Sequence, residues 1–175
     1  MLERKRIRDD VEQRLLVADT AAGQNVFRAR VTPFGAEELP ALAIYTLDEN
    51  GLSERGAQHP MFDTTVVLQI DAFVRKSDGW DDALDDLCEQ VEAALLSDPE
   101  FVKQFERIGA YRTTMKAEDG GEMPVAGAVM SIDLVFTNEF PPVVADDLGL
   151  TNINTIEKCI RTTVTTTNTR VIQIC

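Results

Sequence analysis

The sequence of 175 residues is poor in the side chains on which most catalytic and metal sites depend. It holds one His, His59, and three Cys, at positions 88, 159 and 175. One His excludes most sites built on several imidazoles, and the Cys stand in no CxxC or Cys/His spacing typical of zinc ligands. Three Cys form no closed set of disulfides, so we expect a reducing, intracellular compartment.

Long hydrophobic runs are also missing from this sequence. No apolar stretch approaches the roughly 18 residues of a membrane span. The first ten residues, MLERKRIRDD, are basic but are not followed by the apolar stretch of a signal peptide. We therefore expect no membrane partner.

Positive charge is scarce relative to negative charge. The chain has 17 Lys and Arg against 30 Asp and Glu, a net charge of −13. This balance argues against a protein that wraps nucleic acid, because gripping phosphates needs a basic surface. The charge balance remains compatible with a protein that lines a passage for DNA, because a negative surface repels phosphate and does not bind it. Residues 76–100 hold one basic and nine acidic residues, a local charge of −8, so the negative charge is concentrated in one region.

Hydrophobic periodicity predicts an α+β fold. The sheet is mixed and largely antiparallel, has four to five strands and carries two main helices on one face. The pattern places a helix at 2–20, a second that opens at 77–79 and runs to about 96, and a short third at 99–105. It places strands at 26–31, 39–45, 64–74, 107–118 and 125–137, and a long loop at 47–62. In strand 64–74 the even-numbered positions are the apolar side, which we expect to face the core. The predicted domain is 1–140, and a β-rich C-terminal extension occupies 141–175.

Two charged groups are candidate subunit or partner interfaces. The first consists of basic residues in the opening turns of the first helix, where the helix dipole disfavours cations: Arg4, Lys5, Arg6 and Arg8. The second consists of carboxylates on the acidic helix: Asp81, Asp82, Asp85 and Asp86. Each group is either a solvated surface or a contact with an oppositely charged partner. The acidic pairs at four-residue spacing could also share a divalent cation, but nothing nearby supplies further ligands.

No convincing catalytic site emerges from the remaining polar residues. Cys88 lies on the apolar stripe of the acidic helix, where a small buried residue is expected, and His59, the only imidazole, is in a distant loop. We therefore predict no enzymatic activity, no cofactor and no bound metal.

The C-terminal segment 159–175 is rich in Thr, Val and Ile and contains no Gly or Pro, which is typical of strands. It could fold back onto its own sheet or pair with the sheet edge of a neighbouring subunit, an assembly role that we favour. Its candidate contact residues are Arg161, Val164, Arg170 and Ile172.

The order and spacing of these elements give a resemblance over residues 5–138. The features that carry it begin with a first helix leading to Gly23 and then Val26-Phe27, an acid-x-Pro-Ala strand at 38–45 and a strand ending at 70–74 before the acidic helix. They continue with Leu96-Ser97-Asp98-Pro99 at the helix break, the Tyr111 strand with an acidic turn at Glu118-Asp119, and a last strand ending in Val135-Phe136. In these features the chain resembles the tail terminator proteins of long-tailed bacteriophages, of the minor tail protein U type. Residues 141–175 extend beyond the region of resemblance.

The resemblance implies a structural protein of the virion, located at the head-proximal end of the tail and assembled in the host cytoplasm. Such proteins form a ring, typically a homohexamer, that caps the completed tail tube and stops its growth. The implied partners are the tail tube protein, a neck or head-completion protein and, in a contractile tail, the sheath protein. DNA passes through the ring without specific binding.

The sequence is compatible with three other interpretations. A head–tail joining protein of the connector side would bind portal or adaptor rings instead of the tail tube. A small acidic metal-dependent hydrolase would use the paired carboxylates of the acidic helix. A free-standing cytosolic α+β binding module would have no link to a virion.

Overall fold

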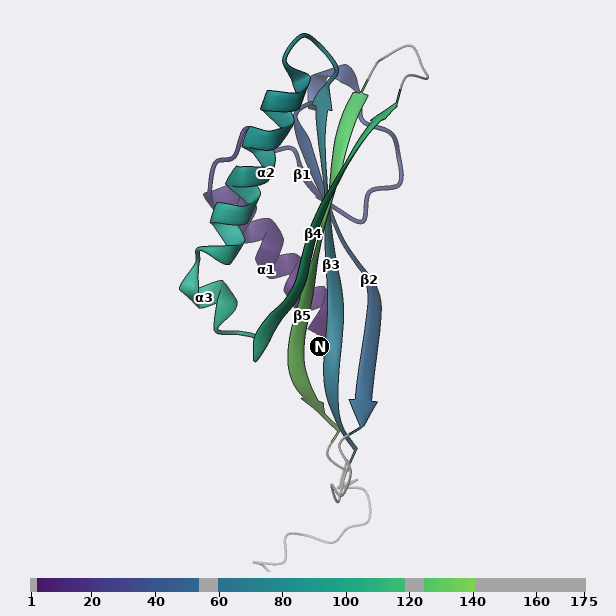
Figure 1. Ribbon diagram of the computed structural model, residues 1–175, viewed down its shortest axis with the longest axis vertical. Helices are drawn as coiled ribbons and strands as arrows, with labels where there is room; N and C mark the ends of the chain where they lie inside the picture. Colours follow the sequence, from purple (N-terminus) through teal and green to yellow (C-terminus); the bar gives the residue numbers. More distant parts are fainter. Residues whose placement is uncertain (1–2, 54–59, 119–124, 141–175) are drawn as a thin grey trace, which may run out of the picture. The chain divides into compact units, whose positions relative to one another are not determined.

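A computed structural model describes residues 3–53, 60–118 and 125–140 of the chain. It has three α-helices, one short 3-10 helix and five strands in these ranges (Figure 1). Their order is α1 (Glu3–Val17), β1 (Val26–Arg28), a 3-10 helix (Ala36–Glu38), β2 (Ala41–Ser53), β3 (Met61–Arg75), α2 (Trp80–Leu96), α3 (Pro99–Val102), β4 (Arg107–Glu118) and β5 (Val125–Glu139).

The five strands form one sheet in the order β1-β2-β3-β5-β4. Strands β1 and β2 are parallel, whereas the other three neighbouring pairs are antiparallel. Helices α1 and α2 cover one face of this sheet (Figure 1). The predicted α+β class is therefore confirmed, with a mixed, largely antiparallel sheet and two main helices on one face. The C-terminal extension lies outside the described residues, so its β-rich character stays a prediction.

The core lies between the helices and the sheet. Helix α1 contributes Ile7, Val11 and Leu15, which recur every four residues and are fully or almost fully buried. The buried side chains of α2 repeat at three- and four-residue steps in the same way. In β3 the even-numbered positions from 64 to 74 are buried, as the alternation predicted.

The first half of β2 is apolar on both faces, as predicted, because the sheet is covered there on both sides. Ala41, Leu42, Ala43 and Ile44 are all fully buried. The helices cover one face, and the segment after β1 crosses the other (Figure 1). On that second face the ring of Phe34 packs against Phe27 and Phe73, with centroid distances of 5.6 and 4.9 Å.

Arg30 closes this small aromatic cluster. Its guanidinium lies 4.5 Å from the ring centroids of both Phe27 and Phe34, the arrangement of a cation–π contact. It also donates two hydrogen bonds to Glu38, at 2.8 and 2.7 Å. These bonds hold the pKa of the Glu38 carboxyl below its ordinary value.

The long loop predicted at 47–62 is wrong in most of its length. Strand β2 continues to Ser53 and β3 begins at Met61, so the two form a long antiparallel hairpin. Residues 47–53 are exposed, so their polar composition resembles that of a loop. An irregularity between Thr46 and Asp48 also interrupts the alternation of the strand.

Two further boundaries differ from the prediction. Helix α1 ends at Val17, short of the predicted residue 20, and Asp19 (φ 49°) is the first residue after it with left-handed backbone; Gly23 (φ 53°) is left-handed as well. Strand β1 ends at Arg28, because Ala29 also has positive φ (49°) and turns the chain away from the sheet.

Candidate assembly surfaces

The basic residues at the start of α1 are held by partners within the chain. Arg4 forms an ion pair with Glu49 on the distal half of β2, at 2.8 Å. Arg8 donates a hydrogen bond to the hydroxyl of Thr46, also on β2. These contacts fix the start of α1 against β2. Two of the four basic side chains that the sequence predicted to meet a partner are therefore already bonded within the chain.

Lys5 and Arg6 form ion pairs along α1 itself. Lys5 lies 2.6 Å from Asp9, and Arg6 lies 2.7 Å from Glu3. Helix α1 contains five basic and four acidic residues, a net charge of only +1. The basic group is therefore largely balanced by its own helix.

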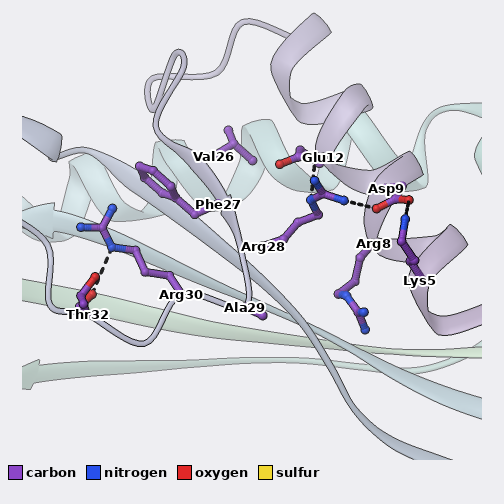
Figure 2. Close-up of a pocket in the computed structure, with 10 residues that line it drawn as sticks. All are labelled: Lys5, Arg8, Asp9, Glu12, Val26, Phe27, Arg28, Ala29, Arg30 and Thr32. Atoms are coloured by element: carbon purple, nitrogen blue, oxygen red, sulfur yellow. Dashed lines mark hydrogen bonds and ion pairs between the residues drawn. The ribbon is translucent and has the colours of Figure 1, made fainter.

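A pocket of about 620 Å³ opens between α1 and the end of β1 (Figure 2). On its α1 side Arg28 forms ion pairs with both Asp9 and Glu12, the latter at 2.9 Å. The hydrogen bonds from Lys5 and Arg28 hold the pKa of Asp9 below its ordinary value. Arg8 points away from these carboxylates in Figure 2. On the α1 side of the pocket, the carboxylates of Asp9 and Glu12 are therefore already paired with cations of the same chain.

The acidic residues of α2, unlike the basic residues of α1, have no ionic partners among the described side chains. Asp81, Asp82, Asp85 and Asp86 are exposed. Within the described ranges, none of the four forms an ion pair with another side chain. Helix α2 carries six carboxylates and no basic residue. The structure does not bring this group together with the basic start of α1, because the two lie at opposite ends of the helical layer (Figure 1).

Cys88 lies on the buried side of α2, as the sequence predicted, with 5% of its surface exposed. Burial raises the pKa of its thiol to about 11, and the charges of Asp85 and Glu92 add to this effect. The neighbouring Tyr111 of β4 donates its hydroxyl hydrogen bond to Glu92. Burial, followed by that bond, raises the pKa of Tyr111 to about 12. Both groups are therefore protonated at neutral pH, so neither provides an activated nucleophile.

Sequence reasoning missed a basic group on β4, the edge strand of the sheet. Arg107, Arg112 and Lys116 are exposed and stand in register with Val135, Ser131 and Gly127 of β5. Ser131 and Gly127 alternate with buried β5 positions, and Ile108, next to Arg107, packs against the core, so the three cations lie on the face of the sheet opposite the helices. The sequence carried a signal of this face in its alternation. The polar positions Arg112, Thr114 and Lys116 alternate with Tyr111, Thr113 and Met115, which places the two sets on opposite faces of the strand.

Other predicted site residues are outside what the structure describes. The predicted contact residues Arg161, Val164, Arg170 and Ile172 belong to the segment 141–175. His59, which the sequence predicts to be a loop residue and not a site, lies in the segment 54–59. In the described ranges, no group of three or more His, Cys, Asp and Glu side chains is placed to hold a metal ion. No helix in those ranges is long and apolar enough to span a membrane.

Comparison with known proteins finds likeness at the level of structure. No family model and no curated protein sequence matches this chain. Among solved structures, a chain from the "virion of native gene transfer agent (GTA) particle" is similar, with a TM-score of 0.41 and 14% sequence identity. The match covers 74% of this chain and 95% of that chain.

Proposed function

We propose that this chain is a structural virion protein of a long-tailed phage-like particle, and that it forms a ring which caps the completed tail tube. The proposal begins from the family resemblance over residues 5–138. The observation that carries it is the order of elements, since a helix, two strands, a long strand, the acidic helix α2, the short helix α3 and the β4–β5 hairpin follow one another in the order on which the resemblance rests.

The surface chemistry supports an assembling protein over an enzyme. The most concentrated charge, on α2, is solvent-exposed and lacks ionic partners among the described side chains. Among the described residues, the buried thiol of Cys88 has a raised pKa, because burial and the nearby carboxylates disfavour the thiolate. A ring requires each subunit to present two different complementary faces, because a closed ring is built from heterologous contacts.

In the proposed role the ring binds the last layer of tail tube protein and stops further addition. Its opposite surface receives a neck or head-completion protein, and DNA passes through the opening. An acidic wall suits this passage, because it repels phosphate and does not retain it. The C-terminal segment 141–175 would be an assembly arm that reaches a neighbour.

The test is a tube-growth assay with purified tail tube protein from the same particle. We expect tubes grown with this chain to stop at a shorter, narrower length distribution than tubes grown alone. An unchanged length distribution contradicts the proposal. Retention of the chain by immobilised connector protein, together with an unchanged tube length, would instead favour a connector-side joining protein.

A further inference from the structure

The basic edge of β4, formed by Arg107, Arg112 and Lys116, is a charged surface with few partners of its own. Arg107 and Arg112 make no ion pair or hydrogen bond with another described side chain. The charge of Lys116 acts on Asp71, whose pKa it lowers against the larger raising effect of burial. Residues 107–116 contain these three cations and no acidic residue.

From this surface we infer that the basic edge of β4 receives the acidic α2 of a second copy of the chain. Helix α2 has six carboxylates and no cation, whereas this stretch of β4 has three cations and no carboxylate. Charges of opposite sign on two surfaces steer and select association, while like charges oppose it. The inference rests on the proposed function, because it names the contact between neighbouring subunits of the ring.

The positions of the two surfaces suit a ring. Helix α2 lies on one face of the sheet, and the side chains of Arg107, Arg112 and Lys116 lie on the opposite face. A subunit therefore does not satisfy its own β4 cations with its own α2. Contact between the α2 face of one copy and the β4 face of the next is heterologous, which is the kind of contact that closes into rings.

The lengths of the two surfaces are also compatible. The β5 partners of successive β4 cations are four residues apart. Neighbouring cations of the edge are therefore separated by about 13 Å along the strand. The exposed carboxylates from Asp81 to Glu89 extend over about 12 Å of helix axis. One α2 helix can therefore face two neighbouring cations of the edge, and Arg112 with Lys116 is the pair next to an apolar surface.

That apolar surface provides area for the contact. Beside Lys116 lies a hollow of about 240 Å³, lined on the same face by Phe73, Val125 and Val129. These three side chains are half-buried within the single chain. The carboxylates of Asp71 and Asp133 lie on the inner strands β3 and β5, so the complement to α2 is the β4 edge and not the whole sheet face.

The start of α1 is a weaker complement to α2. Arg4, Lys5 and Arg6 already form ion pairs with Glu49, Asp9 and Glu3. A partner carboxylate there would have to displace these acids, whereas Arg112 has none to displace. This difference distinguishes the two basic surfaces experimentally.

The experiment uses two charge-reversed full-length variants and measures self-association by sedimentation equilibrium at low ionic strength, where screening is weak. Variant A carries Arg112→Glu and Lys116→Glu, and variant B carries Asp81→Lys, Asp82→Lys, Asp85→Lys and Asp86→Lys, which changes the charge of α2 from −6 to +2. Alone, each places like charges in every contact, so we expect its association constant to fall at least about tenfold below wild type. Mixed in equal amounts, A and B regain complementary contacts in both directions, so we expect association at the wild-type level.

A matched control carries Lys5→Glu and Lys103→Glu, which changes the net charge as much as variant A does. Both side chains are exposed, and we expect this control to associate like wild type. Unfolding midpoints for all variants establish that each one folds. The recovery in the A and B mixture is a readout that misfolding would not produce.

Several outcomes overturn the inference. They are a wild-type chain that stays monomeric up to its solubility limit, variants A or B that associate like wild type, and a mixture that does not recover. Failure of the proposed function is distinguishable from these. If the chain caps tubes but its self-association is unchanged by the charge reversals, the inference fails and the proposed function is supported. If the variants associate as expected but the chain has no effect on tube growth, the inference is supported and the proposed function fails.

Discussion

At the scale of single residues, burial explains why a free thiol in this chain is inert. Cys88 is surrounded by the apolar side of α2 and the sheet, with carboxylates on the same helix nearby. Both influences disfavour the thiolate, because one removes water and the other adds negative charge. Folding thus raises the thiol pKa from its ordinary value of 9.0 to about 11.

We predict that Cys88 resists alkylation in the folded protein. In a chain carrying Cys159→Ser and Cys175→Ser, a pKa of about 11 leaves about one thiolate per thousand molecules at pH 8. Iodoacetamide labelling, followed by mass spectrometry, should be at least about a hundredfold slower than in urea-unfolded chain. Complete native labelling at the unfolded rate would contradict this account.

The same shift has a consequence for stability at high pH. Because the folded pKa lies above the unfolded value of 9.0, the contribution of the neutral thiol is fully present below pH 9.0. It is lost as the pH rises towards about 11. A Cys88→Ala variant should therefore show a smaller loss of stability between these two pH values than the parent chain, measured by urea denaturation.

Residue-level patterns were the most predictable part of the fold. Alternation in β3 identified its buried side, and the four-residue recurrence of Ile7, Val11 and Leu15 identified the buried side of α1. These patterns depend on local geometry alone. The ion pair of Arg4 with Glu49 joins residues far apart in sequence, so no local pattern could show that this cation is occupied.

At the scale of elements, α1 depends on its apolar stripe for docking. We predict that Val11→Ala lowers the free energy of unfolding by about 2 kcal/mol, since it removes two buried methyl groups and leaves a cavity. Val17→Ala is the matched control, because Val11 is 0% and Val17 83% exposed. We expect the control to change stability by less than about 0.5 kcal/mol. Urea denaturation measures both, and equal losses would contradict the described docking.

The β4–β5 hairpin contains an irregularity that requires a glycine. Register shifts between Ile108 and Tyr111, and a Cβ placed on Gly109 would lie 2.9 Å from the Cβ of Asp133. We predict that Gly109→Ala costs about 1–3 kcal/mol of stability, because the clash is with a carbon near the backbone.

Gly35→Ala is a control for that substitution. Its added Cβ would be 3.6 Å from Glu38 Oε2, an ordinary contact distance, so thermal unfolding should be almost unchanged. A Gly109→Ala chain as stable as the Gly35→Ala chain would show that the strands do not approach closely at this point.

Element lengths were less predictable than element types. The distal part of β2, residues 47–53, has exposed side chains on both faces, so no hydrophobic alternation marks it. The strands of the β2–β3 hairpin are held by pairing with each other, and β3 also pairs with β5. The β4 cations were missed for a related reason, since their significance depends on which strand lies at the edge of the sheet.

At the scale of the whole molecule, the domain division remains a prediction. The helical layer and the sheet that it covers form one hydrophobic core within residues 7–136. We therefore expect a chain ending at residue 140 to unfold cooperatively, with a Tm within about 4 °C of the full-length chain. Calorimetry tests this, and a chain that fails to fold without residues 141–175 would place part of the core in the extension.

The central claim is that this chain forms a ring on the end of a tail tube. Its surface suits that role because acidic and basic groups lie on opposite faces of the sheet and so can join neighbouring copies. The most direct measurement is electron microscopy of assembled tail tubes mixed with the purified chain. We predict a ring of added density at one end of each tube, whereas tubes with both ends bare at saturating protein would contradict the account.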